Sequence, residues 1–203
     1  MPEIAGIDVS RETIARIEEF QALVLKWTKK INLIAPSTAT DVWQRHIVDS
    51  AQLYRHVDHD YKLWVDIGSG GGFPGIVLAC LAKELRPDAT FVLIESDQRK
   101  STFLRTAARE LALPVTAISK RIEEAPAQNA DVISARALGS LDQLLHFSAP
   151  HLKSDGICAF QKGRTHQTEI VAARANWQFE LEAHQSITDS EAAILILKDI
   201  ARD

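Results

Sequence analysis

The stretch Trp64-Val-Asp-Ile-Gly-Ser-Gly-Gly-Gly-Phe-Pro-Gly-Ile-Val77 decides the fold of this chain. It leaves an apolar run of strand type, crosses a loop with five of the nine glycines of the chain, and enters an apolar segment of helix type. Glycine lets a ligand approach the backbone closely and adopts positive φ without steric cost. A purely structural turn rarely needs so many glycines, so the loop predicts a ligand site between a strand and a helix.

From Tyr61 onward, short apolar runs at 63–67, 91–95, 115–118, 131–135 and 157–161 alternate with amphipathic stretches near 74–84, 97–111, 140–152 and 164–175. This alternation predicts an α/β fold in which helices wrap a mainly parallel sheet. The last two runs, 177–184 and 193–198, are joined by a short connection, which suits an antiparallel hairpin at the sheet edge. We therefore expect about seven strands, the last pair antiparallel.

The first sixty residues have helical periodicity instead. Ser10 is a candidate N-cap, and apolar residues then recur at three- and four-residue steps up to Trp27. A second periodic stretch runs from about Thr38 to Leu53. We predict an N-terminal helical extension over residues 1–60 and a core domain over residues 61–203.

Composition narrows the function classes. Of the 203 residues, 46% are hydrophobic and 25% are charged, which is typical of a globular protein. No apolar run approaches the ~20 residues that span a bilayer, and no signal-peptide pattern opens the chain. Cys80 and Cys158 lie in apolar stretches, so we interpret them as buried thiols of a cytoplasmic protein. With a net charge of −4, any polyanion must meet a local basic patch.

The glycine spacing alone does not choose a cofactor. Gly70-x-Gly72-x-x-Gly75 formally matches the dinucleotide fingerprint, which is a weak signal. Asp66 closes the strand, however, and its carboxylate suits the ammonium and sulfonium of S-adenosylmethionine better than a pyrophosphate at the helix N-terminus. The pattern favours S-adenosylmethionine. A nicotinamide-dependent oxidoreductase and a non-catalytic nucleoside-binding regulatory module remain the alternatives.

Two further segments fit a nucleoside. The second strand ends at Glu95, whose carboxylate oxygens can accept hydrogen bonds from both ribose hydroxyls. After the third strand, Ile122 and Glu123 offer an apolar and an acidic group where an adenine lies in such a fold.

The chemistry of the methyl acceptor is indicated mainly by missing motifs. Enzymes that methylate an exocyclic base nitrogen typically have an Asp/Asn-Pro-Pro-aromatic tetrapeptide after the fourth strand, and this chain has none there. Methylation of pyrimidine C5 needs a cysteine nucleophile in a loop at a strand end, whereas Cys158 lies within a strand and is a poor candidate. An acceptor with its own lone pair, such as a purine ring nitrogen, needs no base. The polar run with His56, Asp58, His59 and Asp60 could hold a metal, but we expect a solvated loop there and predict no metal.

More selective motifs run through residues 20–200. They are Lys26-Trp27, Arg45-His-Ile-Val-Asp-Ser50, Asp66-Ile-Gly-Ser-Gly-Gly-Gly-Phe-Pro-Gly75, Glu95-Ser-Asp-x-Arg-Lys-x-x-Phe-Leu104, Arg121-Ile-Glu-Glu124, Ser134-Ala-Arg-Ala137 and Lys162-Gly163. With these motifs the chain resembles the glucose-inhibited division protein B family, bacterial methyltransferases that act on N7 of a guanine in 16S rRNA. The resemblance implies a Rossmann-like class I methyltransferase fold, S-adenosylmethionine as cofactor, and 16S rRNA or the small ribosomal subunit as partner. No obligatory protein partner is evident.

The resemblance also implies site residues. It places cofactor contacts at Gly68, Phe73, Ile122, Glu123 and Arg136, to which the loop and ribose arguments add Gly70, Gly72 and Glu95. We expect Arg136 to position the reactants by holding the cofactor carboxylate or a substrate phosphate, with no side chain required as acid or base. Family members often carry Glu-Arg before the last strand, and this chain has Ser190-Glu-Ala-Ala193 there, so the role of that arginine is not carried over.

RNA contact is expected from a local basic patch. Its predicted members are Lys26, Lys29, Lys30, Arg45, His46, Arg99, Lys100, Lys162 and Arg164. On the second helical stretch, the i, i+4 spacing allows Arg45 to pair with Asp49 and His46 to pair with Ser50. We expect this stretch to wall the substrate entrance.

Overall fold

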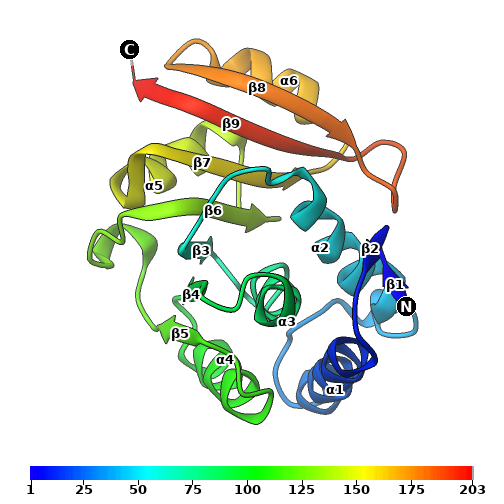
Figure 1. Ribbon diagram of the computed structural model, residues 1–203. Helices are drawn as coiled ribbons and strands as arrows, with labels where there is room; N and C mark the ends of the chain where they lie inside the picture. The colour runs from blue at the N-terminus through cyan, green and yellow to red at the C-terminus, as the bar shows by residue number, and fades with distance from the viewer. Residues whose placement is uncertain (203) are drawn as a thin grey trace.

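A seven-stranded sheet forms the centre of the protein in a computed structural model that describes residues 1–202 (Figure 1). In chain order its strands are β3 (Leu63–Ile67), β4 (Thr90–Ile94), β5 (Val115–Ile118), β6 (Ala130–Arg136), β7 (Leu152–Lys162), β8 (Trp177–Gln185) and β9 (Ala193–Arg202). Their spatial order is β5-β4-β3-β6-β7-β9-β8. Strands β3 to β7 pair in parallel, whereas β9 is antiparallel to both β7 and β8. The predicted mainly parallel sheet with an antiparallel C-terminal hairpin is confirmed.

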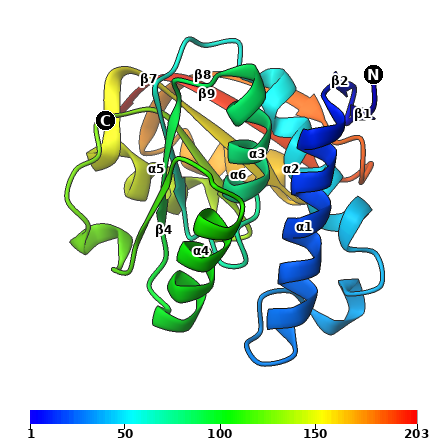
Figure 2. The same cartoon turned by 60° about the horizontal axis from the view of Figure 1, so that its bottom comes forward.

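Helices cover both faces of this sheet. On one face lie α1 (Arg11–Thr28), α3 (Gly75–Leu85) and α4 (Gln98–Glu110), which Figure 2 shows side by side. A helical segment over residues 43–56 lies on the same face; it consists of a π-helix (Trp43–Val48), one turn of α-helix, α2 (Asp49–Ala51), and a 3-10 helix (Gln52–His56). On the opposite face lie α5 (Leu141–Ser148) and α6 (His166–Ala173). Each face therefore has its own hydrophobic core.

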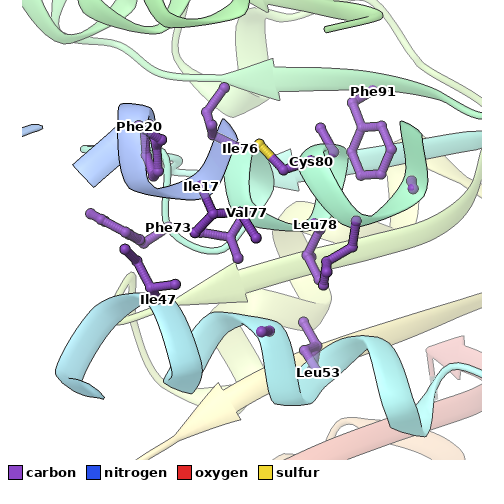
Figure 3. Close-up of a cluster of buried hydrophobic side chains, with 14 of the residues drawn as sticks. Ile17, Phe20, Ile47, Leu53, Phe73, Ile76, Val77, Leu78, Cys80 and Phe91 are labelled. Atoms are coloured by element: carbon purple, nitrogen blue, oxygen red, sulfur yellow. The ribbon is translucent and has the colours of Figure 1, made fainter. Parts of the chain in front are cut away.

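Helix α3 is the central element of the first core. Every residue from 75 to 82 is buried, as expected of a helix that is apolar on all sides. Figure 3 shows the reason: Ile17 of α1 and Ile47 of the 43–56 segment pack against α3 from outside. The N-terminal extension thus shares one core with the sheet, and the predicted boundary near residue 60 stays a prediction.

The start of α1 is fixed by contacts that the sequence only partly indicates. Ser10 is the N-cap, because its side-chain oxygen accepts a hydrogen bond from the Thr13 amide at 3.2 Å. Glu84, at the end of α3, accepts hydrogen bonds from the Ser10 amide and the Thr13 hydroxyl at 3.0 and 2.6 Å. Before Ser10 the chain forms two short strands, β1 (Glu3–Ile4) and β2 (Ile7–Asp8). The prediction of helix alone was wrong there, since strands of two residues carry no periodicity.

Within residues 1–202, no helix is both long and apolar enough to cross a membrane.

Candidate functional site

The glycine loop is attached to the neighbouring strand by its first amides. Those of Gly68 and Ser69 donate to the Ile94 carbonyl at the end of β4, at 2.9 and 3.2 Å. Gly70 has a φ of +53°, which favours glycine, and a Cβ built there would meet only the Gly68 carbonyl, at 3.8 Å. The loop therefore presents bare backbone to open space, as a ligand that approaches closely requires.

Asp66 lies beneath this loop and is fully buried. Its Oδ1 accepts a hydrogen bond from the Ser134 hydroxyl at 2.6 Å, and that hydroxyl accepts one from Trp64 Nε1 at 2.9 Å. These contacts join β3 to β6. The interpretation that Asp66 faces the cations of a cofactor was wrong, because the carboxylate is buried between β3, β6 and the first residue of α3. Burial raises its pKa to about 6.

This raised pKa makes a prediction about stability. Between pH 4 and pH 6 the folded protein holds a proton on Asp66 that the unfolded chain has released, so this carboxyl contributes less stability as the pH rises through that window. We expect the free energy of unfolding of the wild type, minus that of Asp66→Asn, to fall by about 2 kcal/mol from pH 4 to pH 6. Urea titrations of both proteins at several pH values measure this difference. A stability difference between the two proteins that stays constant or increases with pH would contradict the raised pKa of Asp66.

A cavity of about 430 Å³ opens above the loop, and we call it the first cavity. Seven of the eight predicted cofactor residues line it: Gly68, Gly70, Phe73, Glu95, Ile122, Glu123 and Arg136. Glu95 joins two segments of its wall, because its carboxylate accepts hydrogen bonds from the amides of Gly70 and Asp97, both at 2.8 Å. Sequence reasoning missed several lining residues, namely Leu33, Lys100 as a cavity residue, Lys120, Leu138 and Phe147. Of these, only Lys120 and Leu138 carried a positional signal, because they follow a predicted strand end by two and three positions.

Gly72 is the exception among the predicted cofactor residues. It is buried behind the loop and does not line the first cavity. A Cβ built there would lie 2.7 Å from a side-chain carbon of Ile76 and 3.1 Å from the ring of Phe20. Gly72 therefore allows α1 and α3 to pack closely, and the expected cofactor contact is corrected to a packing role.

Arg136, at the end of β6, contacts several elements of the site. Its Nη1 donates to Asp49 Oδ2 at 3.1 Å and to the Arg45 carbonyl at 3.4 Å, while Nη2 donates to His46 Nδ1 at 2.9 Å. The guanidinium also lies 5.1 Å from the centre of the Phe73 ring, within cation–π range. Arg136 thus fixes the 43–56 segment against the glycine loop.

These contacts replace the pairs expected along the 43–56 segment. Asp49 pairs with Arg136 rather than with Arg45, which is exposed. The Ser50 hydroxyl donates to the backbone carbonyl of His46, at 2.6 Å, and not to its ring. The expected i, i+4 side-chain pairs were therefore wrong, because the π-helical turn and the partner from β6 change which groups meet.

The hydrogen bonds of His46 fix its protonation state. Nδ1 accepts from Arg136, and Nε2 lies 2.8 Å from the Thr38 hydroxyl, which itself donates to the Ala35 carbonyl. The ring is therefore neutral with its proton on Nε2. Burial and then the Arg136 charge lower its pKa to about 4. Both ring nitrogens are occupied, so His46 is not free to act as a base.

A second cavity of about 220 Å³ lies beside the first, and Arg136 and Ala137 line both. Its wall also includes Asp49, Gln161 and the turn between β8 and β9. The Asp49 carboxylate is saturated: Oδ1 accepts from Gln52 and Thr188 at 2.9 and 2.8 Å, and Oδ2 accepts from Gln161 at 3.0 Å in addition to Arg136. Sequence reasoning assigned no role to Gln161 or Thr188, because residues 52, 161 and 188 meet only in the folded chain.

The predicted RNA-contact residues separate into two groups. Those that are exposed, as a phosphate contact requires, are Lys26, Lys29, Lys30, Arg45, Arg99 and Arg164. Lys162 is buried: its Nζ donates to the Gly139 carbonyl and pairs with Glu169, each at 2.6 Å. This ion pair joins β7 to α6, but Lys162 also lines the second cavity, so its RNA contact stays a prediction. His46 is half-buried and, as described, engaged on both ring nitrogens.

The polar run 56–60 does not gather around a common point. The His56 ring stacks on His184 at 4.1 Å, and Asp60 pairs with Arg86. Within residues 1–202, no group of three or more His, Cys, Asp or Glu side chains is arranged to hold a metal. Burial raises the pKa of both Cys80 and Cys158 to about 12, so neither is a ready nucleophile.

Comparison with known proteins supplies the family. The profile of the family described as rRNA small subunit methyltransferase G matches residues 13–196. The chain belongs to this family. A ribosomal RNA small subunit methyltransferase G of Cereibacter sphaeroides is 54% identical over 198 residues, which cover 98% of this chain and 96% of that protein. The corresponding protein of a Jannaschia species is 49% identical over 187 residues, which cover 92% and 89%.

The fold agrees with this family. The crystal structure of a SAM dependent methyltransferase from Aquifex aeolicus matches with a TM-score of 0.60 at 13% identity, over 86% of this chain and 97% of that one. The predicted Rossmann-like methyltransferase fold and the resemblance drawn from the motifs are both confirmed. A member of the rRNA small subunit methyltransferase G family is an rRNA methyltransferase, so the predicted enzyme class is confirmed as well. Neither the relatives nor the solved structure favours a nicotinamide-dependent oxidoreductase.

Proposed function

We propose that the protein transfers a methyl group from S-adenosylmethionine to N7 of a guanine in 16S rRNA. The observation that carries this proposal is the pair of adjoining cavities at the carboxyl ends of the parallel strands, which Arg136 separates. In open α/β sheets ligands bind at this edge. The first cavity takes the cofactor and the second takes the acceptor base. Such a substrate places the enzyme in the cytoplasm.

The first cavity has the chemistry that S-adenosylmethionine requires. Glu95 presents a carboxylate for the ribose hydroxyls, and the apolar Ile122 beside the exposed Glu123 suits an adenine. At Gly70 the open backbone allows the methionine part to approach closely. When bound, the cofactor supplies a methyl group on a positively charged sulfur. The residues present therefore fit this donor.

The chain contributes position rather than acid–base chemistry. In-line transfer to a ring nitrogen with its own lone pair needs the two reactants aligned, and alignment alone can supply about 7–11 kcal/mol of the barrier. His46 has no free nitrogen, and both thiols are buried. Arg136 touches both cavities and is held by Asp49 and His46, so it sets the wall against which donor and acceptor meet.

Transfer of a labelled methyl group tests the proposal directly. Unmodified 16S rRNA and unmodified small subunits are incubated with the enzyme and labelled S-adenosylmethionine, and the product nucleoside is identified. We expect 7-methylguanosine in at least one of the two substrates. Binding of S-adenosylmethionine without any methyl incorporation would favour the nucleoside-binding regulatory module instead. Binding of a nicotinamide dinucleotide in its place would favour the oxidoreductase.

Glu95→Gln is expected to weaken cofactor binding. The neutral amide turns an N–H group toward the backbone amide of Gly70 or Asp97 and loses the charged acceptor for a ribose hydroxyl. Losing a hydrogen bond to a charged group predicts a Kd about 10–100-fold higher. Calorimetry with S-adenosylmethionine measures this, with Glu110→Gln on the exposed face of α4 as the matched control. Equal affinity in the two variants would show that Glu95 does not contact the cofactor.

The RNA-binding surface makes a prediction about salt. Lys29 and Lys30 lie exposed at the end of α1, and each phosphate they neutralise adds about one unit to the slope of log K against log salt. We expect the double substitution Lys29→Ala and Lys30→Ala to reduce that slope by about two. Arg11→Ala, at the other end of the same helix, is the control and should leave it unchanged. Filter-binding titrations from low to physiological salt give the slopes, and identical slopes would remove α1 from the RNA-binding surface.

A further inference from the structure

The second cavity is of a size for a single base. At about 220 Å³ it is smaller than the roughly 300–1,000 Å³ of drug-sized ligand sites. An enzyme that reacts with a base takes that base out of its stack and into a pocket. The phosphates on either side of the target guanosine therefore stay at the mouth of the cavity, where a cation can bind them.

Arg45 lines this cavity and does not line the first one. Two backbone hydrogen bonds fix its position: its amide donates to the Asp41 carbonyl at 3.0 Å, and its carbonyl accepts from Arg136 Nη1 at 3.4 Å. The Arg45 side chain therefore starts next to the wall that the two cavities share. Because Arg45 does not line the first cavity, it is not placed to bind the cofactor.

The guanidinium of Arg45 has no partner of its own. The side chain is exposed, and no hydrogen bond or ion pair within residues 1–202 uses it. Of the two carboxylates at helical spacing from it, Asp49 already accepts from four donors, and Asp41 forms no ion pair with it. The Arg45 charge nevertheless acts on the site, because it adds to burial and Arg136 in lowering the pKa of His46.

The other cations that line the second cavity are neutralised within the fold. Arg136 pairs with Asp49 at 3.1 Å, and Lys162 pairs with Glu169 at 2.6 Å. Among the lysines and arginines of this wall, Arg45 is therefore the one without an anionic partner within residues 1–202.

We propose that the Arg45 guanidinium binds a phosphate that flanks the target guanosine, at the mouth of the second cavity. This inference rests on the proposed function. An arginine presents a planar set of donors that can meet two phosphate oxygens at once. Asp189, exposed in the turn between β8 and β9, also lines the cavity and repels a phosphate from its own part of the mouth. Arg45 thus holds one defined phosphate, whereas Lys29 and Lys30 on α1 attract the RNA in general.

The test removes the charge of one phosphate at a time. Once labelled-methyl transfer has located the modified nucleotide, RNA is made with a neutral methylphosphonate on the 5′ or on the 3′ side of that guanosine. This RNA is used in the form, free or in the small subunit, that the enzyme methylates, and its kcat/KM is compared with that of the natural RNA. For the wild type we expect a loss of about tenfold or more at one of the two positions, because a hydrogen bond between two charged groups is lost.

Variants of Arg45 identify the side chain that senses this charge. Arg45→Ala should show the same loss with the natural RNA, and no further loss with the methylphosphonate at that position. It should bind S-adenosylmethionine as tightly as the wild type, since Arg45 does not line the first cavity, and this binding shows that the variant is folded. Arg45→Lys keeps the charge but not the planar donors, so it should retain part of the discrimination.

Two matched controls separate this contact from general attraction. Lys29→Ala should weaken RNA binding but keep the full discrimination between phosphate and methylphosphonate. Gln44→Ala, exposed on the same segment as Arg45 and lining neither cavity, should behave as the wild type.

Equal kcat/KM for the natural RNA and both methylphosphonate RNAs in the wild type would overturn the inference, as would a discrimination that persists undiminished in Arg45→Ala. The wild-type comparison decides even if Arg45→Ala fails to fold. Absence of methylation on the natural RNA would instead count against the proposed function.

Discussion

Arg136→Ala is expected to reduce kcat/KM for methyl transfer by about a hundredfold or more while the protein stays folded. The side chain touches both cavities and joins the 43–56 segment to the end of β6. Without it, Asp49 loses its charged partner, His46 Nδ1 loses its donor, and the wall between donor and acceptor is no longer fixed. Displacement of reacting groups by about 1 Å can cost on the order of a hundredfold in rate.

Two further measurements distinguish this role from loss of structure. The Arg136 charge helps to lower the pKa of His46, so NMR titration of Arg136→Ala should show that pKa shifted upward from about 4. Arg136→Lys should restore little activity, because one ammonium cannot reproduce the planar set of donors that meets Asp49 and His46 together. Arg105→Ala, on the exposed face of α4, is the control. Unchanged turnover of Arg136→Ala at saturating cofactor and RNA would reject the positioning role.

Gly75→Ala is expected to lower the free energy of unfolding by about 3 kcal/mol, the upper end for an overpacked core. A Cβ built at this first residue of α3 would lie 2.3 Å from a methyl carbon of Leu93 and 2.8 Å from Asp66 Oδ2, and both side chains are fully buried. Neither can move away, since Leu93 packs in the core and Asp66 is held by Ser134. The helix start must therefore shift, and the glycine loop shifts with it.

Urea unfolding followed by tryptophan fluorescence measures this effect. Gly163→Ala is the matched control, because a Cβ built there meets nothing within 4 Å, and its stability should stay within about 0.5 kcal/mol of the wild type. Equal unfolding midpoints for the two alanine variants would show that the close approach at Gly75 is relieved elsewhere.

The local sequence pattern was sufficient to predict much of the fold and the cofactor side of the site. The spacing of the apolar residues predicted the strands of the sheet and the helices that cover it, because each element must turn apolar side chains toward the core at its own period. The glycines of the loop and Glu95 were recognisable because parallel strands end at one edge, where loop and carboxylate must meet. The two-residue strands β1 and β2 left no such pattern. The apolar period over residues 38–53 predicted a helix there but did not indicate its π-helical turn, Trp43–Val48.

The sequence by itself determined the sheet, the cofactor loop and the family, because each depends on residues close together in the chain or on motifs that can be read directly. Only the tertiary structure decided how charged and polar side chains are used. It buried Lys162 against Glu169 and Asp66 against Ser134, and it brought Asp49, Arg136 and Gln161 to one wall. The physical reason is that the partner of a charge is chosen by distance in the folded chain, and the partners of Asp49 are separated from it by up to 139 positions in sequence.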